Sequence, residues 1–425
     1  PFICSVTISN TGTQKFQNRF LFTMVLELFL ISLIMNDKPP LTLEEKHRRD
    51  RRYPRCSIKR YIDSPFLNLY NSGNDQALMN CTAVDNRVFR ELLSLFKPVY
   101  DTYTVDQSNN IRKLKLSKDG KPRGRTREVD AVACLGLVLF WYRTRGSCAR
   151  SVALIFGLTA TPMYRWIRFG RRVLLSVLQH DERARVMEPT EPQIEKYIAA
   201  IADRYPICGE ERVWCACDGL KLNLAKSTNW AVQNRNFNGW THGDYINGVF
   251  VFAPDGKIKM SLINAPGTWH DSTMAEYGIY QKMESVYNRL GGKVVVDSAF
   301  SLANKPFIIK SSDKKEFVNS LGEPDCRAVV LNAQATSVRQ LSEHGMRMIQ
   351  GQFPRIKDNM QLEEFGERKV ILHLMILLYN YQTSTIGVNM ILNSFMSHTK
   401  HFNSYRFTYH NNQLFRISEM APANL

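Results

Sequence analysis

The chain has 425 residues, enough for two or three domains with a substantial core in the largest. Hydrophobic residues make up 44% and charged residues 22% of the chain, which excludes a largely disordered or membrane-embedded protein. The net charge of +17 is clustered along the sequence, so it favours a polyanionic partner, and nucleic acid more than a membrane surface.

The first 60 residues predict a poorly ordered basic extension. An apolar run over residues 21–35 is shorter than the roughly 20 residues of a bilayer span, so we expect no membrane segment. The chain begins at Pro1, and Met35 is an alternative start. The basic run over residues 44–59 fits a nuclear-import signal, a DNA-backbone arm or a solvated linker. An import signal would give the nuclear localisation that we expect.

Residues 61–195 predict an all-α region. Apolar residues recur at helical spacing over 88–96, and residues 128–143 are apolar on most faces, as in a buried helix. Two shorter helices are predicted over 147–157 and 160–174, with a glycine-containing turn between them. This arrangement is that of a helix-turn-helix, a DNA-binding motif.

The second of these short helices predicts a contact with DNA. It would begin at Pro162, with Thr161 as its cap. Its predicted exposed face carries four arginines, Arg165, Arg168, Arg171 and Arg172. The basic stretch over residues 112–127 contains two glycines and a proline and predicts a loop that lies along phosphates. A plain helical bundle with a basic surface is the alternative.

The nine cysteines do not predict a secreted disulfide framework, because their number is odd, their spacing irregular and the chain large. Cys208, Cys215 and Cys217 suggest zinc ligands, but they lack a partner pair at the spacing of a zinc finger. Cys215 and Cys217 would alternate to the same face of a strand, so we expect buried thiols.

Residues 205–395 predict an α/β domain whose mixed sheet is flanked by helices, and residues 396–425 a C-terminal tail. The predicted elements are a strand over 212–224, a hairpin of strands over 245–252 and 257–263, a helix over 271–288, a buried strand over 293–296 and an apolar helix over 364–378. This order is that of an RNase H-like fold.

Three carboxylates lie in these predicted strands, directly after one of them, or in a later helix. Asp218 lies in the first strand, Asp297 at the end of the buried strand, and Glu343 in a later helical stretch. Divalent metal ions take charged oxygen ligands, and two ions a few Å apart stabilise both the attacking and the leaving oxygen of a phosphodiester. The sequence therefore predicts a two-metal nuclease site.

Several short motifs accompany these acids. They are Cys217-Asp-Gly219, Gln233-Asn-Arg-Asn-Phe-Asn-Gly-Trp240, Ala265-Pro-Gly-Thr-Trp-His-Asp-Ser272, Val296-Asp-Ser-Ala-Phe300, and Arg339-Gln-Leu-Ser-Glu343 followed by Met348-Ile-Gln-Gly-Gln-Phe353. In this order and spacing they resemble the PIF/Harbinger superfamily of transposases, called DDE superfamily endonucleases, which includes domesticated Harbinger-derived nucleases. The resemblance covers about residues 85–390.

The resemblance implies an RNase H-like fold, two Mg²⁺ or Mn²⁺ ions, and cleavage and joining of DNA strands. It assigns Asp218, Asp297 and Glu343 as catalytic acids and metal ligands. Asp271 competes with Asp297 as the second ligand, and the two are not exclusive. Topology favours Asp297, because Asp271 follows the third strand.

Other polar residues are expected to support these acids. His270 would order its loop by hydrogen bonding, since imidazole is a less natural ligand for Mg²⁺ than carboxylate, and Ser272 would be an accessory residue of the same motif. Lys221, Lys226 and Arg339 would hold the DNA backbone.

Alternatives remain for two of the acids. Asp218 could be a turn residue, since Asp-Gly is a turn signal. Glu343 could be a solvated helix carboxylate, with Glu363 and Glu364 as rivals for its role.

The chain departs from the family pattern at three places. Residues 346–347 read Met-Arg where many members have Phe-Gly, Gln350 replaces a basic residue, and Tyr379-Asn380-Tyr381 stands where His-Asn is expected. None of these changes removes a carboxylate.

The leading hypothesis is a metal-dependent DNA endonuclease and transposase. A domesticated DNA-binding protein without cleavage activity is the alternative, and a nuclease acting on RNA or small phosphoesters is a third. The expected partners are double-stranded DNA at transposon ends and targets, a Myb-like protein, and further copies of the chain.

Overall fold

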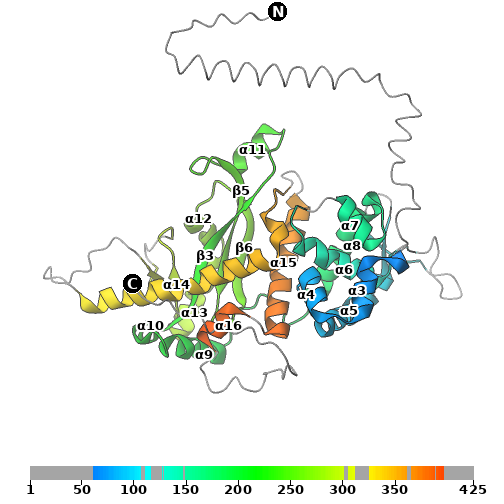
Figure 1. Cartoon of the computed structure of the whole chain (residues 1–425). Coiled ribbons are helices and arrows are strands. Elements are labelled where there is room, and N and C mark those ends of the chain that lie inside the picture. Colours follow the sequence, from blue (N-terminus) through cyan, green and yellow to red (C-terminus); the bar gives the residue numbers. More distant parts are fainter. Residues whose placement is uncertain are drawn as a thin grey trace, which may run out of the picture. The chain divides into compact units, whose positions relative to one another are not determined.

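The computed structural model describes residues 61–106, 111–115, 127, 129–146, 149–300, 305–311, 325–360, 365–387 and 389–396 (Figure 1). The chain divides into two units, Pro1–Lys59 and Arg60–Leu425, and all described residues belong to the second. The predicted basic extension, with its apolar run, and nearly all of the predicted tail lie outside the described residues. Among those described, no helix combines the length and apolarity that a membrane crossing requires.

The first half of the described chain is helical, as the apolar periodicity predicts. Its elements are η2 (Tyr61–Asp63), α3 (Pro65–Ser72), α4 (Asp75–Thr82), α5 (Asn86–Thr102), α6 (Ala131–Arg143), α7 (Ala149–Phe156) and α8 (Ala160–Leu178). Side-chain caps fix several helix starts: a carboxylate oxygen of Asp85 accepts from the Val88 N–H at 2.7 Å, and one of Asp130 accepts from the Ala133 N–H at 2.8 Å.

Two local predictions in this region are wrong. The stretch predicted to be a loop from residue 112 begins in a short hairpin of β1 (Tyr103–Val105) and β2 (Ile111–Lys113). Helix α8 starts at Ala160 with Thr159 as its N-cap, two residues before the predicted start. The glycine turn before it is present, since Gly157 has a φ of 62°, which suits a residue without a Cβ.

The second half is built on a mixed six-stranded sheet. Its strands are β3 (Val213–Asn223), β4 (Phe237–Asn238), β5 (Gly243–Phe252), β6 (Ile258–Pro266), β7 (Lys293–Val296) and β8 (Ile308–Lys310). The strand β5 pairs antiparallel with β3, β4 and β6, whereas β7 pairs parallel with both β3 and β8. The predicted strands and hairpin are confirmed, and the topology is consistent with an RNase H-like domain.

Helices cover both faces of this sheet. One face packs on α9 (Glu191–Ala202), α12 (Asp271–Glu276) and α13 (Ile279–Leu290), and the other on α14 (Cys326–Gln352) and α15 (Phe365–Ile386). Alternation along the strands separates the two cores: Val294 and Val296 of β7 join the first, and Val295 joins the second. The smaller helices are α10 (Pro206–Glu210), α11 (Trp230–Asn236), η3 (Pro354–Lys357) and α16 (Met390–Phe395).

Two predicted helices have different bounds. The single helix predicted over 271–288 is divided into α12 and α13, because Gly278 between them has a φ of 112°. The helix α15 continues to Ile386, beyond the predicted end at residue 378.

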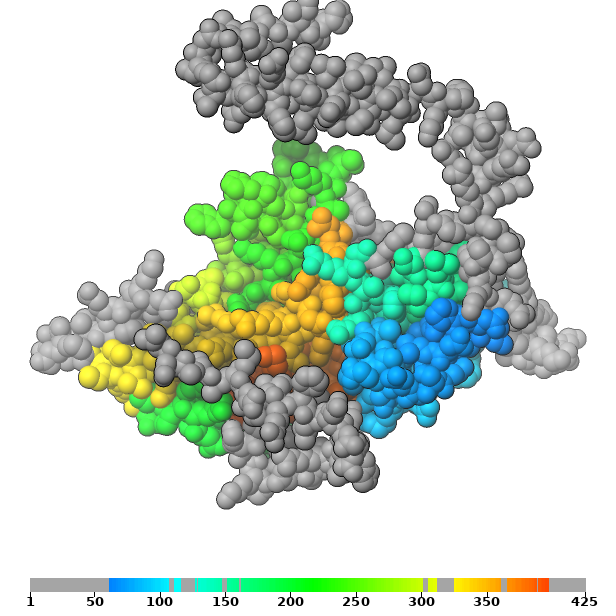
Figure 2. Space-filling view, in the orientation of Figure 1, coloured from blue at the N-terminus to red at the C-terminus, as the bar shows by residue number. Residues whose placement is uncertain are grey.

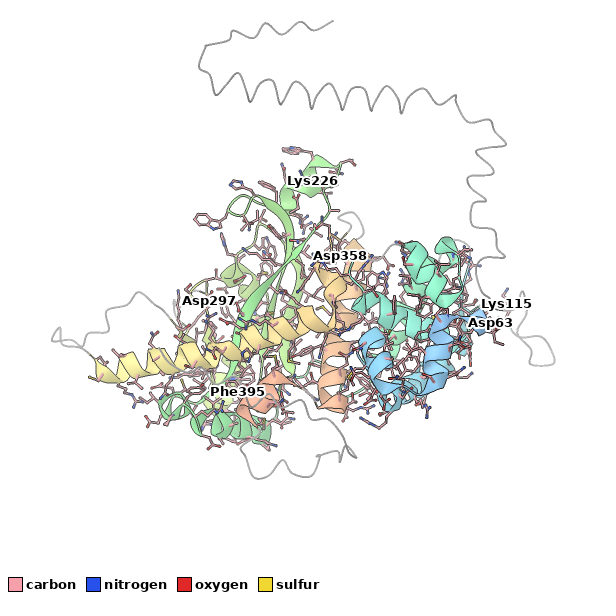
Figure 3. The ribbon with its side chains drawn as sticks, in the orientation of Figure 1. Asp63, Lys115, Lys226, Asp297, Asp358 and Phe395 are labelled. Carbon is pink, nitrogen blue, oxygen red and sulfur yellow. The ribbon has the colours of Figure 1, made fainter. Side chains whose placement is uncertain are left out.

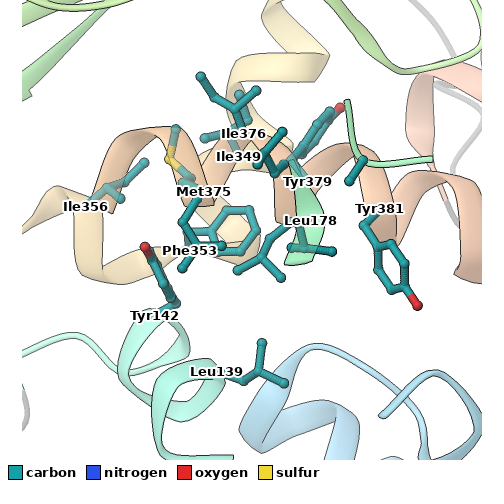
Figure 4. Packing of buried hydrophobic residues seen from close by; sticks show 14 of the residues in the cluster. Leu139, Tyr142, Leu178, Ile349, Phe353, Ile356, Met375, Ile376, Tyr379 and Tyr381 are labelled. Carbon is teal, nitrogen blue, oxygen red and sulfur yellow. The ribbon is translucent and has the colours of Figure 1, made fainter. Parts of the chain in front are cut away.

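The helical region and the sheet share one hydrophobic core. Figure 4 shows Leu139 and Tyr142 of α6 and Leu178 of α8 near residues of α14 and α15, and all of these belong to one cluster. The Tyr142 hydroxyl donates to the Ile371 carbonyl at 2.8 Å. A substitution in the buried face of α15 is therefore expected to disturb the packing of both the helical region and the sheet.

The buried Asn380 joins α15 to the sheet. Its side-chain oxygen Oδ1 accepts from the Ile258 N–H at 2.9 Å, and its side-chain amide donates to the Ile258 carbonyl at 3.0 Å. This residue lies where the chain departs from the family pattern, and in this structure it anchors the start of β6.

Candidate active site

Asp218 lies in the middle of β3, not in a turn. It pairs with Phe250 of the neighbouring strand β5, and one of its own carboxylate oxygens accepts from the Gly219 N–H at 2.8 Å. Strand alternation gives it the parity of Ala216 and Leu220, which belong to the core on the α14 side. The turn interpretation of Asp218 is therefore wrong, and its carboxylate belongs to the face of the sheet covered by α14.

Asp297 directly follows the adjacent strand. Cys217 of β3 is in register with Val296 of β7, and the two strands are parallel. Asp218 and Asp297 are therefore the next residues along two hydrogen-bonded neighbours, a placement that follows from the strand order alone (Figure 3 labels Asp297).

Asp271 approaches β3 from its position as the first residue of α12. A Cβ built on Gly219 would lie 2.4 Å from its Oδ1, so only glycine leaves room for this carboxylate. By alternation, Gly219 belongs to the face opposite Asp218. Asp271 thus stands beside the acid-bearing strand but on the α12 side.

The three aspartates influence one another electrostatically. Burial raises the pKa of Asp218 to about 6, and the negative charges of Asp297 and Asp271, in that order, add to the rise. The pKa of Asp271 is also raised, by burial and by Asp297, although Lys221 and His270 oppose the rise. Asp297 acts more strongly on Asp218 than Asp271 does, which favours the pair that topology selects.

Glu343 lies on α14, as predicted, but its carboxylate is engaged elsewhere. It forms an ion pair with Arg339 at 2.6 Å and a longer one with Arg347 at 4.0 Å. The Arg339 charge also lowers the pKa of Asp218, so this arginine stands within electrostatic reach of both acids. Glu343 as a metal ligand stays a prediction, and its rivals Glu363 and Glu364 lie outside the described residues.

The carboxylates are of the right chemical type to bind a divalent cation, but they do not lie close enough together in this structure to do so. Carboxylate oxygens are the ligands that Mg²⁺ and Mn²⁺ prefer, and burial together with neighbouring carboxylates raises the pKa values of Asp218 and Asp271. Within the part of the chain that the structure describes, no three His, Cys, Asp or Glu side chains lie close enough to hold a metal ion. Asp218 and Asp297 fit as the core of such a site.

A network of amide side chains holds the loop that precedes Asp271. The Asn247 amide donates to the Trp269 carbonyl at 2.8 Å, and the Asn238 amide donates to the Gly267 carbonyl at 3.0 Å. A Cβ on Gly267 would lie 2.3 Å from the Asn236 carbonyl oxygen. The sequence motif over residues 233–240 had no assigned role, and the structure gives part of it a bracing one.

The predicted DNA-contacting arginines of α8 do not form one exposed face. Arg171 is buried. Its guanidinium forms an ion pair with Glu367 at 3.3 Å and lies over the Trp141 ring. Its assignment as a DNA contact is therefore wrong: it links α8 to α15. Arg172 is 43% exposed but also pairs with Glu367. Arg165 and Arg168 are half-buried, whereas Lys221 and Lys226 are exposed, and DNA contact by these four stays a prediction.

The cysteine prediction is confirmed as far as burial goes. Cys208, Cys215 and Cys217 are fully buried, and Cys215 and Cys217 belong to the same core cluster. Burial raises the pKa of each thiol.

Substituting Gly219 by Ala is expected to displace the Asp271 carboxylate without unfolding the strand. The new Cβ would fall 2.4–2.7 Å from the three carboxyl-group atoms, which must rotate away. If Asp271 serves the reaction, metal-dependent nicking of plasmid DNA falls by about tenfold or more, since about 1.4 kcal/mol is a tenfold change in rate. Gly351→Ala is the control, because a Cβ there meets nothing within 4 Å. Equal nicking by both variants would remove Asp271 from the site.

Comparison with known proteins places this site in a recognised segment. Residues 217–380 match the family described as DDE superfamily endonuclease, and this segment contains all four acids. No curated protein matches the chain.

Two solved structures show a low-scoring likeness. A Mos1 transposase paired-end complex with left transposon end shares 10% identity over 57% of this chain and 83% of that chain, at a TM-score of 0.16. A pre-cleavage Mos1 transpososome shares 10% identity over 64% of this chain and 82% of that chain, at a TM-score of 0.17.

Proposed function

We propose that this protein is a metal-dependent DNA endonuclease and transposase of the PIF/Harbinger type. The observation that carries the proposal is the register of two parallel strands, which makes Asp218 in β3 and Asp297 directly after β7 neighbouring positions. They lie inside a segment that matches a DDE superfamily endonuclease, a family that generally uses divalent metal ions. The net charge of +17 supports DNA as the substrate.

The chain's own residues would supply the metal ligands and the positioning. Asp218 and Asp297 would hold Mg²⁺ or Mn²⁺, with Glu343 joining once its carboxylate exchanges Arg339 for metal. When bound, the divalent ions supply charge stabilisation of the attacking and leaving oxygens of the phosphodiester. Arg339, freed from Glu343, and the exposed Lys221 would then orient the DNA backbone.

The remaining features of the proposal concern partners and location. Transposition requires two DNA ends held together, so we propose a dimer or larger assembly acting on double-stranded transposon ends and targets. A Myb-like partner would assist DNA binding, and the site of action would be the nucleus. A domesticated DNA-binding protein without cleavage is the competing proposal, favoured by the ion pair that occupies Glu343.

Cleavage of supercoiled plasmid by the purified full chain tests the proposal. The expected result is nicking that requires Mg²⁺ or Mn²⁺ and is lost in Asp218→Asn and Asp297→Asn. Glu284→Gln is the matched control, since this exposed carboxylate of α13 is outside the site. DNA binding without nicking, also after a Myb-like partner is added, would favour the domesticated alternative.

A further inference from the structure

An exposed aromatic segment projects from the sheet between β3 and β5. Residues 225–242, called the finger here, contain α11 and β4, and in Figure 1 α11 lies at the far end of β5. Trp230 is 77% exposed, Trp240 is 91% exposed, and Phe237 is 41% exposed. Large apolar side chains this exposed on one short segment indicate a surface that binds something.

The charge of the finger identifies its partner as an anion. It contains Lys226, Arg235 and His242 but no Asp or Glu. The side chains of Lys226 and Arg235 are both exposed. Figure 3 shows Lys226 beside α11, and the green segment carrying the finger stands out on the face drawn in Figure 2. Aromatic rings interleaved with cations are the combination that binds unpaired nucleotides, since bases stack and phosphates pair with the cations.

A pocket at the base of the finger has room for a base. Its volume is about 530 Å³, and its lining includes Asn223, Lys226, Phe237, His242, Tyr245 and Asn359. Asp244 also lines the pocket, and its carboxylate accepts from the Gln233 side-chain amide at 2.6 Å. This volume lies within the range of about 300–1,000 Å³ typical of small-ligand sites. The lining offers rings for stacking and amide groups that can hydrogen-bond to a base edge.

Hydrogen bonds connect the finger to the loop that precedes Asp271. The side-chain oxygen Oδ1 of Asn238 accepts from the N–H groups of Trp240 and Thr241, both at 3.1 Å, while its side-chain amide donates to the Gly267 carbonyl. The Thr268 hydroxyl donates to the Arg235 carbonyl at 3.2 Å. Asn238 therefore couples the turn that presents Trp240 to the loop leading to Asp271.

The strand β3 sets the distance between the finger and the acids. Asp218 and Asn223 are five residues apart on β3, about 17 Å at roughly 3.3 Å per residue. A DNA strand advances about 3.4 Å per nucleotide, so the pocket lies about five nucleotides from a phosphate at Asp218.

We propose that the finger and its pocket bind unpaired nucleotides of the DNA substrate near the cleaved phosphate, with Trp230 and Trp240 stacking on the bases. The proposal rests on the nuclease function above and adds a preference: DNA that is locally melted near the cut is bound more tightly than fully paired DNA. Stacking is tolerant of sequence, so the preference concerns pairing state and not base identity.

Binding of fluorescent oligonucleotides to the full chain, measured by anisotropy in EDTA, tests this inference. One duplex is fully paired, and the other has a run of unpaired thymines. Wild type is expected to bind the second duplex more tightly. In Trp230→Ala/Trp240→Ala the ratio of the two affinities should fall by about tenfold or more, with unchanged binding to the paired duplex. Trp240→Phe should retain most of it, and Val329→Ala, an exposed apolar site on α14, all of it.

Four results would overturn the inference. If wild type nicks plasmid with Mg²⁺ but shows no preference, or if the double alanine variant keeps the preference, the finger does not bind unpaired bases and the nuclease function stands. If the double variant changes only the sedimentation coefficient of the protein, the finger binds a second copy of the chain. If wild type binds neither DNA, the inference and the proposed function fall together.

Discussion

Asp218→Asn is expected to make the metal-free protein more stable above about pH 6 while lowering metal-dependent nicking by about 10³-fold or more. Several kcal/mol of transition-state stabilisation depend on metal held by this carboxylate, and each 1.36 kcal/mol is a tenfold change in rate. The stability gain arises because Asn removes a buried negative charge that faces two others. Its amide oxygen can still accept the Gly219 N–H.

The direction of the pH dependence follows from the raised pKa. Asp218 titrates at about 6 in the fold against an ordinary value of 3.8, so the folded protein holds this proton more tightly than the unfolded chain. The resulting stabilisation is full below about pH 4 and is lost as the pH rises through about 6. Asn resembles the protonated acid at every pH. The variant should therefore match wild type below about pH 4 and exceed it above about pH 6, by up to about 3 kcal/mol at 1.36 kcal/mol per pKa unit.

Thermal unfolding in EDTA across this pH range measures the effect. Glu284→Gln, which removes an exposed carboxylate, should follow wild type throughout. Saturating Mg²⁺ should then raise the midpoint temperature of wild type until it approaches or exceeds that of the variant, because metal binds only the folded site. A variant no more stable than wild type at about pH 8 would show that the carboxylates are not crowded, contrary to the raised pKa.

The positions of Asp218 and Asp297 were predictable because they depend on strand order and alternation. A strand, a hairpin and a helix before a second buried strand place that strand beside the first, and its terminal acid beside Asp218. Burial of Cys215 and Cys217 followed from the same two-residue period. Periodicity is a local signal, and these features are set locally.

Features that depend on distant partners were not predictable from the sequence. Arg171 has the helical spacing of an exposed basic residue, but its partner Glu367 lies 196 residues away on α15. The helix break at Gly278, where φ is 112°, is not predicted by the sequence either, because a glycine inside a helical pattern is often tolerated. The Arg339–Glu343 ion pair is by contrast local, since opposite charges four residues apart on a helix favour this contact.

The shared core explains why the arginines of α8 cannot be interpreted as a separate DNA-binding surface. The helix α8 packs against α15, which also lies on the sheet carrying the acids. Residues of α8 that face α15 are therefore fixed by packing, and only its outer residues remain for a ligand. Binding measurements on α8 variants must be separated from losses of stability.

Glu367→Gln is expected to lower the free energy of unfolding by about 3 kcal/mol or more, the typical cost of removing one member of a buried ion pair. Its carboxylate serves Arg171, whose side chain is 6% exposed, so the charge of Arg171 would stay buried at the junction of α8 and α15. Arg172→Gln removes the other arginine of the same carboxylate, 43% exposed, and should cost less than about 1 kcal/mol.

Urea denaturation of the full chain, followed by circular dichroism, measures both values. Under conditions where each variant is folded, Glu367→Gln should bind duplex DNA with the affinity of wild type, because the buried Arg171 contacts α15 and not the ligand. Equal stability losses in the two variants would mean that Arg171 is hydrated and not buried. A selective loss of DNA affinity in folded Glu367→Gln would restore α8 to the DNA-binding surface that the sequence predicts.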